Sequence, residues 1–284
     1  MTTLLGLEYT DENLQKLADK FILNDFVQDE RGLLALQSFS LDKSKDEPVE
    51  YFTEEMIAMI LKYGRDLSEY QAKGDVKEAV ITVPSYFTQE KREMMIQAAD
   101  LAGLRVEQLV HENTAAAVMY GIDRMDTEKD LHVLLYNMGA TDTEVSVVRY
   151  SAVTDGKTEK THEQVEILGE GYDQTLGGKA FDDVLVNIFA DQFNGMKERQ
   201  GKSDIRENKR AMRRLYKEIG KTKDVLSANR ITDVKVSELA DYVTLFFKLD
   251  RETFEEKSAH LFERVAKPIE TALQEAGLTV DDID

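Results

Sequence analysis

Several residue types that carry protein chemistry are missing from this chain or scarce in it. No cysteine occurs among the 284 residues, which excludes disulfides, zinc–thiolate sites and thiol nucleophiles but leaves the redox compartment open. The four histidines, His111, His132, His162 and His260, are scattered. None of them has the spacing to another histidine or to a glutamate that a zinc hydrolase uses, so we expect no such site.

Positive charge and long apolar runs are also in short supply. With 36 basic against 55 acidic residues the chain carries a net charge of −19, which repels nucleic acid and anionic membrane surfaces, so we expect neither as a partner. No stretch reaches the ~18 consecutive apolar residues of a membrane span, and no secretion signal follows Met1. A bound nucleotide would need local cations or Mg²⁺.

The remaining composition is that of a soluble globular protein. Apolar residues make up 42% of the chain and charged residues 32%, enough for a sizeable core in one large or two mid-sized units. The chain opens at "TTLLGLEYTDENLQKLADKF" as though inside a domain and stops at "LTVDDID" just after a helical pattern. We therefore expect a fold that is truncated at both ends.

The first 70 residues mix helical and extended patterns. Thr10 or Asp11 is the expected N-cap of the first helix, and Thr53 that of the second. The predicted elements are a helix at 10–21, an extended run at 32–41, a polar loop at 43–50 and an amphipathic helix at 52–69 with apolar positions that include Ile60 and Leu67.

Strands and helices then alternate up to residue 137. The β-branched run "EAVITVP" is typical of a buried parallel strand ended by Pro84, and Gly103 ends the helix that follows it. The series is a strand at 78–84, a helix at 88–103, a strand at 105–110, a helix at 113–122 and a strand at 131–137. Such alternation predicts a parallel or mixed α/β sheet, and we place a domain boundary near residues 122–130.

From Asp173 onward helical patterns dominate. A period-2 run at 232–250 predicts a hairpin, and Pro268 predicts a kink or break near Lys267. The predicted helices are 181–194, 208–229 and 251–277.

The stretch "YNMGATDTEVSVV" at 136–148 joins two β-rich runs through a small polar turn. A tight turn of small residues lets backbone N–H groups approach an anion such as a phosphate. A fully active phosphate loop would offer more glycines and a carboxylate for a metal, whereas this turn has Asn137, Ala140 and Asp142. A nucleotide site, a degenerate nucleotide site and a plain hairpin are all compatible with the turn.

A family resemblance favours a nucleotide site over a plain hairpin. Residues 80–122, "VITVPSYFTQEKREMMIQAADLAGLRVEQLVHENTAAAVMYGI", resemble the nucleotide-binding domain of the seventy-kilodalton heat-shock chaperones, as do "LGGKAFDDVLV" at 176–186 and "LSAN" at 226–229. The "YNMGATDTEVSVVRY", "GYDQTLGG" and "HLFERVAKPIETALQEA" segments look like its large endoplasmic-reticulum hypoxia-up-regulated branch more than the cytosolic 110-kilodalton one.

The resemblance implies an α/β, actin-like (ribonuclease-H-like) two-lobed ATPase fold. Residues 1–125 would form a partial first lobe, and residues 126–284 a second lobe that lacks its last strand and helix. Counterparts of the family's first phosphate loop and second adenosine loop are not found, so we expect residues 1–284 to bind ATP or ADP weakly or not at all.

The same resemblance assigns roles beside the γ-phosphate. Glu112 matches the carboxylate that orients a metal-bound water, although any helix start favours an acidic residue. Asn137 stands where active members have an aspartate that serves magnesium. Because an amide has no charge to hold the cation, we expect slow hydrolysis at most.

The glycine-rich turns match phosphate-facing positions. Gly139, Ala140 and Thr141 match residues whose N–H groups face phosphate, and Asp142 replaces a hydroxyl residue, so its carboxylate would repel phosphates unless Mg²⁺ intervenes. Gly177 and Gly178 match a second turn near the phosphates. The alternatives are a plain β-turn for the first group and an ordinary helix start for the glycine pair.

The nucleoside would lie further along the chain. Lys223 and Ser227, four residues apart on one helix face, match positions that meet the ribose and adenine, with a solvated helix face as the alternative. Gly220 and Asp224 stand where active members have a glutamate and an adenine-stacking arginine. Loss of that arginine removes roughly 1–2 kcal/mol of stacking and charge interaction.

The function implied is that of an ATP-binding domain, using ATP or ADP with Mg²⁺, of a diverged large chaperone that assists protein folding. It would act as nucleotide exchange factor for a conventional seventy-kilodalton heat-shock chaperone, and unfolded client proteins would be further partners. The implied compartment is the endoplasmic reticulum lumen, with the cytoplasm as alternative. An active ATP-hydrolysing chaperone and an actin-fold sugar or acetate kinase are the competing functions.

The hairpin at 234–249 would contact the partner chaperone. Glu238 and Asp241 suit an acidic rim around an apolar centre. The alternative is that Tyr242, Leu245 and Phe247 pack the core of their own lobe.

Overall fold

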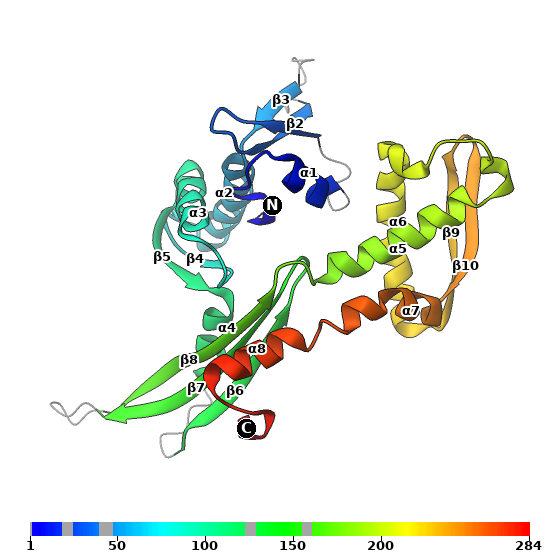
Figure 1. Cartoon of the computed structure of the whole chain (residues 1–284). Helices are drawn as coiled ribbons and strands as arrows, with labels where there is room; N and C mark the ends of the chain where they lie inside the picture. The colour runs from blue at the N-terminus through cyan, green and yellow to red at the C-terminus, as the bar shows by residue number, and fades with distance from the viewer. Residues whose placement is uncertain (1, 19–24, 40–47, 123–128, 155–160) are drawn as a thin grey trace.

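Two three-stranded and two two-stranded sheets organise the part of the chain that the structure describes (Figure 1). The structure, a computed structural model, describes residues 2–18, 25–39, 48–122, 129–154 and 161–284. Helices separate the sheets along the chain, so the α/β class expected from the sequence is confirmed. Within the described ranges, no helix has the length and hydrophobicity needed to cross a membrane.

The first segment is a small antiparallel sheet with short helices beside it. Thr10 Oγ1 accepts the N–H of Asn13 at 3.2 Å, as an N-cap does, so Thr10 is the cap, and the first predicted helix is confirmed up to Ala18; its residues 19–21 lie outside the described residues. The predicted polar loop at 43–50 is wrong at its end, because Pro48 to Glu50 pair with β2; residues 40–47 lie outside the described residues. The elements are η1 Thr2–Leu4, α1 Asp11–Ala18, β1 Asp25–Gln28, β2 Leu34–Phe39 and β3 Pro48–Tyr51.

A buried ion network fastens this sheet to the next helix. Arg31 donates to the Asp29 carboxylate at 2.8 Å and to the Glu54 carboxylate at 2.6 Å, and the two acidic side chains are only 1% and 5% exposed. Burial raises the pKa of both carboxyl groups. The guanidinium and the hydrogen bonds to the carboxylates outweigh this effect and hold both pKa values below the usual range. The network makes Arg31 the cation on which two buried charges depend.

The next elements form a βαβα unit. Strands β4 and β5 pair in parallel, as the alternation predicted, and Thr88 caps α3, which ends before Gly103 at φ 76°. Thr53 is not the N-cap of α2; Phe52 holds that position, and its N–H donates to the Glu55 carboxylate at 2.8 Å. The elements are α2 Thr53–Ala72, β4 Glu78–Val83, α3 Gln89–Leu101, β5 Arg105–His111 and α4 Glu112–Gly121.

Burial in this unit is lower than the sequence predicts. Its core joins Ile57 of α2, Val83 of β4 and Met95 of α3. Val80 is 60% exposed and Ile60 of α2 is also 60% exposed, so the fully buried strand and the full apolar stripe predicted for the helix are wrong. Within the described residues the sheet has two strands, and α2 packs on α3 through Ile57 and Leu61 of the predicted stripe, while Ile60 and Leu67 face outward.

The central sheet is antiparallel and is formed by β6 (Leu131–Met138), β7 (Thr143–Thr154) and β8 (Thr161–Asp173). The sequence analysis did not predict β8. Strand β7 is covered on one side by α4, where Tyr150 donates to the carbonyl of Ala117 at 2.8 Å, and on the other by α8 (Lys267–Ala276), which packs on Val145 and Val147. Its residues are therefore buried on both faces.

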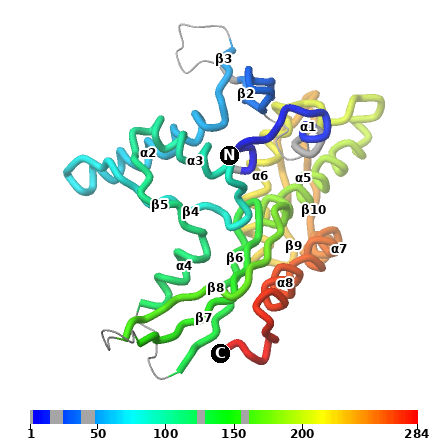
Figure 2. The backbone as a smooth tube through the Cα atoms, turned by 60° about the vertical axis from the view of Figure 1, so that its left-hand side comes forward, coloured from blue at the N-terminus to red at the C-terminus, as the bar shows by residue number. Residues whose placement is uncertain are grey.

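Helix α8 lies along the central sheet (Figure 2) because two glycines of β8 admit it. A Cβ at Gly169 would stand 2.3 Å from the carbonyl oxygen of Ala272, and one at Gly171 would stand 2.1 Å from that of Pro268. Pro268 falls in the first turn of α8, after the break that separates α8 from α7. The predicted break near Lys267 is confirmed.

The last unit packs three helices and a hairpin around one core. Its largest fully buried side chains include Phe189, Phe193, Met212, Leu215 and Ile219. The predicted helices and the hairpin at 232–250 are confirmed. The elements are α5 Gly178–Asn194, η2 Lys197–Arg199, η3 Ile205–Glu207, α6 Lys209–Ala228, β9 Ile231–Ala240, β10 Val243–Asp250, α7 Arg251–Phe262 and η4 Val280–Asp282.

Figure 1 shows how these units are arranged. The segments up to β5 lie on one side, and α5 to α7 with the hairpin lie on the other, while the central sheet and α8 run beneath both. Lys209 at the start of α6 forms an ion pair with Asp25 of β1, which links the two sides. Most of the predicted boundary at 122–130 lies outside the described residues, since residues 123–128 are not described.

Candidate nucleotide-binding site

The turn between β6 and β7 presents free backbone donors. The Gly139 N–H donates to the carbonyl of Asp142 at 2.9 Å and closes the turn. Among the described residues no hydrogen bond uses the N–H groups of Ala140, Thr141 or Asp142. Consecutive unpaired N–H groups in a turn form a concave site for an anion, so the three residues have the local structure that a phosphate site requires.

The start of α5 supports this turn from behind. The N–H groups of Gly178 and Lys179 donate to the carbonyls of Gly139 and Ala140 at 3.0 and 2.7 Å. A Cβ on Gly177 would stand 2.7 Å from backbone atoms of Ala140 and Thr141, so only glycine permits the contact. The glycine pair therefore positions the turn, and its helix N-terminus is occupied by the turn carbonyls.

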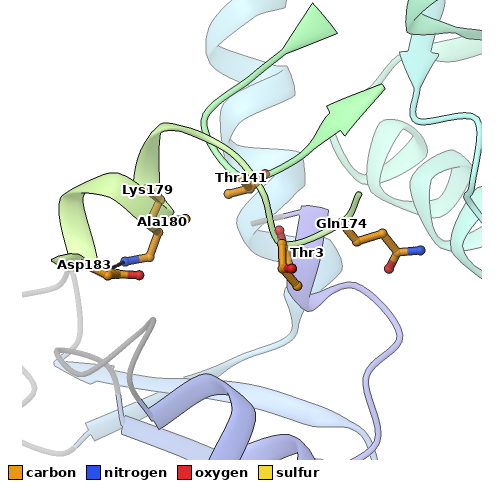
Figure 3. Close-up of a pocket in the computed structure, with 7 residues that line it drawn as sticks. Thr3, Thr141, Gln174, Lys179, Ala180 and Asp183 are labelled. Carbon is orange, nitrogen blue, oxygen red and sulfur yellow. Dashed lines mark hydrogen bonds and ion pairs between the residues drawn. The ribbon is translucent and has the colours of Figure 1, made fainter. Parts of the chain in front are cut away.

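A small pocket of about 40 Å³ opens where the turn meets α5 (Figure 3). Thr141 and Lys179 line it, and Thr3 from the N-terminal segment stands across from them. Lys179 pairs with Asp183 at 3.1 Å. The pocket thus places Thr3, a hydroxyl residue of the N-terminal segment, opposite the β6-β7 turn. The sequence analysis did not predict this arrangement.

Glu112 and Asn137 lie together, as their predicted roles require. The Asn137 amide donates to the Glu112 carboxylate at 3.4 Å. Burial, with the Asp142 charge nearby, raises the pKa of Glu112, and the hydrogen bond from Asn137 opposes the rise. The amide thus satisfies the carboxylate that would otherwise be free to orient a water molecule or a cation.

Asp142 does not point freely toward the turn donors. Its Oδ2 accepts a short hydrogen bond from the Tyr86 hydroxyl, and its Oδ1 accepts one from Thr141 Oγ1 at 3.1 Å. Both carboxylate oxygens are therefore occupied. Tyr86 belongs to the loop between β4 and α3, so the contact also ties that loop to the central sheet.

Glu144 is a further acidic residue that the sequence analysis did not single out. It is 3% exposed; one carboxylate oxygen accepts the Ser85 N–H at 3.2 Å, and the other is buried without a hydrogen-bond partner. Burial raises its pKa to about 7, with the Glu112 charge adding to the rise and Ser85 opposing it. The sequence signal that could have identified Glu144 is an acidic residue inside a strand whose pattern otherwise resembles that of a buried core strand.

No metal centre of protein ligands alone is formed here. In the part of the chain that the structure describes, no group of three or more histidine or acidic side chains has the geometry to hold a metal ion.

Lys223 and Ser227 line a second, open cavity of about 350 Å³, together with Arg251, Phe254 and Phe262. Lys223 pairs with Asp182 at 2.6 Å, and its ammonium nitrogen lies 3.9 Å from the Cβ position of Gly178. Lys223 is thus the side chain that connects the turn region with this cavity. Two aromatic rings and an arginine in the wall suit a flat nitrogenous base.

The other two positions on α6 offer little to a ligand. A Cβ added at Gly220 would meet no atom within 4 Å, and Asp224 is exposed without a hydrogen bond or ion pair among the described residues. Neither replaces the glutamate and arginine that the resemblance puts there. The cavity therefore depends on Lys223, Ser227 and the aromatic wall.

The comparisons with known proteins identify the family of the chain. The family model described as Hsp70 protein matches residues 1–284. The chain belongs to the Hsp70 protein family. Membership brings with it the actin-like ATPase fold, and the mixed α/β structure with small sheets is consistent with that fold.

Individual relatives include Hypoxia up-regulated protein 1 of Xenopus laevis, 37% identical over 99% of this chain and 42% of the relative. Heat shock 70 kDa protein 17 of Arabidopsis thaliana is 38% identical over 91% of the chain and 29% of the relative. Hypoxia up-regulated protein 1 of Danio rerio is 39% identical over 100% of the chain and 28% of the relative. The chain thus spans less than half the length of these Hsp70-family relatives.

Proposed function

We propose that this Hsp70-family chain binds adenine nucleotide between its two sides, which act as the lobes of an actin-like domain spanning residues 1–125 and 126–284. The observation that carries the proposal is the row of unused N–H groups at Ala140, Thr141 and Asp142. These donors would take the phosphates, with Mg²⁺ as the phosphate counterion. The cavity beside Lys223 and Ser227 would take the nucleoside.

Hydrolysis is expected to be slow in this proposal. The Asn137 amide donates to Glu112, so the carboxylate that would orient water is engaged, and no charge at residue 137 holds a cation. The favoured function is therefore a nucleotide-binding chaperone domain with little turnover, and an active ATP-hydrolysing chaperone is the competing function. The Hsp70 match favours both over a sugar or acetate kinase.

Calorimetry with Mg-ADP and Mg-ATP tests the binding proposal. Because the nucleoside cavity is open and a single turn offers the phosphate donors, we expect a Kd on the order of 0.1 mM for the unaltered chain. Lys223→Ala should weaken binding about tenfold, which corresponds to about 1.4 kcal/mol. Lys221→Ala is the matched control, because Lys221 lies on the same helix but pairs with Glu218; equal losses in both variants would contradict the site.

A second proposed function is that the domain docks on a conventional seventy-kilodalton heat-shock chaperone and promotes its nucleotide exchange. The outward side of the β9-β10 hairpin supports this: Tyr242 is 93% exposed and Phe246 57% exposed. Leu245 is buried and Phe247 packs on the core, so the core alternative holds for these two residues but not for Tyr242. Exposed aromatic side chains are typical anchors of protein interfaces.

A charge-reversal test of this surface should leave Asp241 unchanged. Its carboxylate pairs with Arg199, whose side chain is only 4% exposed, so reversal there would leave a buried cation unpaired. Tyr242→Ser with Glu238→Lys is the cleaner variant. Release of labelled ADP from the partner chaperone should slow at least threefold, while Tyr70→Ser, at a tyrosine 84% exposed on α2, should leave it unchanged; an unaltered rate in the first variant removes the hairpin from the interface.

The resemblance to the endoplasmic-reticulum branch supports the lumen of that organelle as the compartment, with the cytoplasm as the alternative. Unfolded proteins are the proposed clients of the whole chaperone.

A further inference from the structure

The loop between β4 and α3, residues 84–88, meets the phosphate-facing turn directly. The Ser85 N–H donates to Glu144 at 3.2 Å, and the Tyr86 hydroxyl donates to Asp142. Arg92 of α3 holds the loop from the other side, because its guanidinium donates to the carbonyls of Phe87 and Ser85 at 3.0 and 3.2 Å. The loop is therefore a fixed support beside the turn.

Packing fixes the ring of Tyr86 as well. Its centroid lies 5.1 Å from that of Tyr172 on β8, at an interplanar angle of 43°, and 6.1 Å from that of Phe87 in an edge arrangement. Phe87 is 6% exposed and belongs to the core of the βαβα unit. The ring thus packs against the βαβα unit and the central sheet, and its hydroxyl donates to Asp142.

Asp142 is the residue that fits a phosphate site least well. Its own N–H is one of the three unused donors. Its carboxylate, however, is negative like the phosphate that those donors would bind. Glu112 and Glu144 add negative charge nearby, since each raises the pKa of Tyr86 together with Asp142 and the larger effect of burial. The raised pKa keeps the Tyr86 proton in place, so the hydroxyl stays a donor.

We propose that Tyr86 is a positioning residue for nucleotide binding, whose hydroxyl holds the Asp142 carboxylate against the β4-α3 loop so that the turn N–H groups remain available to an anionic phosphate. The inference rests on the proposed nucleotide site and deepens it. It explains how this turn tolerates a carboxylate where the family resemblance puts a hydroxyl. The loop residue and the turn residue act as one unit, although 56 positions separate them.

The test is a two-by-two set of variants measured by calorimetry with Mg-ADP. Tyr86→Phe keeps the ring and removes the hydrogen bond that ties the Asp142 carboxylate to the β4-α3 loop, while the bond from Thr141 Oγ1 remains, so affinity should fall about tenfold. Asp142→Asn removes the charge and should bind at least as tightly as the unaltered chain. In the double variant affinity should return to within about threefold of Asp142→Asn, because no charge is left to restrain.

Several results would overturn the positioning role. A double variant as weak as Tyr86→Phe would mean that the hydroxyl only supports the fold, and unchanged affinity in Tyr86→Phe would mean that it does nothing for the site. Tyr172→Phe is the control, because it keeps the neighbouring ring and removes a hydroxyl for which the described residues offer no partner. A matching loss in that control would mean that removing either hydroxyl of this aromatic pair lowers affinity, and that the hydrogen bond to Asp142 is not the cause.

Urea unfolding of the same four chains without nucleotide separates this inference from the proposed function. The effects of the two single changes should be non-additive, since Tyr86→Phe removes the donor of the hydrogen bond and Asp142→Asn removes the charge of its acceptor. If the unaltered chain binds neither Mg-ADP nor Mg-ATP at about 5 mM, the proposed function is refuted. Non-additive unfolding would then still support the fixing of Asp142 by Tyr86, and additive unfolding would overturn it.

Discussion

The buried acid Glu144 allows a direct test of the electrostatics at the turn. Its side chain is 3% exposed on the central strand, with one carboxylate oxygen bonded to the Ser85 N–H and the other without a partner. Burial raises its pKa from 4.5 to about 7. Glu144→Gln replaces it with a neutral side chain of the same shape that can still accept the Ser85 hydrogen bond.

The size and direction of the effect follow from linkage between proton binding and folding. At 1.36 kcal/mol per pKa unit, the rise from 4.5 to about 7 corresponds to about 3 kcal/mol. The folded state binds the proton more tightly than the unfolded state. The free energy of unfolding is therefore highest below pH 4.5, falls as the pH rises to about 7, and stays low above that.

Urea unfolding followed by circular dichroism at a series of pH values measures this change. We expect Glu144→Gln to match the unaltered chain near pH 4.5 and to exceed it by about 3 kcal/mol above pH 7, a gain of roughly 6 °C in Tm. The exposed Glu163 on β8 supplies the control Glu163→Gln, which makes the same chemical change at a solvent-exposed position. Equal stability of Glu144→Gln and the unaltered chain at every pH would refute the reasoning.

Three further predictions address other parts of the structure. Arg31→Ala leaves two buried carboxylates without their cation and should lower the free energy of unfolding by about 3–5 kcal/mol at neutral pH, with a smaller loss in acid, where the carboxylates take up protons. Asn137→Asp places a second carboxylate beside Glu112, so it should lower the Tm in the absence of divalent ions. Added Mg²⁺ should restore the Tm and raise the rate of phosphate release from ATP. A Tm that does not respond to Mg²⁺ would show that residue 137 is not at the metal position. Gly177→Ala places a Cβ 2.7 Å from the backbone of the turn. This change should lower the free energy of unfolding by about 2 kcal/mol and should also abolish nucleotide binding. Gly220→Ala, in open space on α6, should instead gain about 0.5–1 kcal/mol by urea unfolding.

Local signals in the sequence predicted most of the elements. The Thr88 cap and the Gly103 stop define α3, and Pro268 marks the break before α8. Each of these signals works through backbone geometry within a few residues. Where the cap was a residue without a side-chain acceptor, as Phe52 is for α2, the local signal pointed one residue too far, to Thr53.

Burial was harder to predict because it depends on which elements cover a face. The strand β7 is covered on both sides and therefore lacks the alternation that marks a half-buried strand. Conversely, the apolar run of β4 reads as a buried strand, yet Val80 is exposed because the β4-β5 sheet has only two strands.

The candidate site, too, was predictable where a residue acts within its own segment and unpredictable where it acts through distant contacts. The small residues of the turn and the lysine on α6 were identified from their own segments, and the structure brings the turn, the glycine pair and Lys223 together. Tyr86 and Thr3 were not identified, because their contribution arises from contacts with residues far along the chain. No periodicity or cap reports such contacts.

The tip of the β9-β10 hairpin is held in shape by two arginines. Arg199 bonds the Asp241 carboxylate, and Arg214 donates to the backbone carbonyl of Glu238. Glu238, Asp241 and Tyr242 all have positive φ, at 45°, 52° and 61°, a conformation that non-glycine residues adopt only when their surroundings hold them there. The exposed tyrosine is thus presented on a backbone that has already lost its conformational entropy on folding, so a protein that binds the tip meets a preorganised surface and little affinity is lost to ordering it.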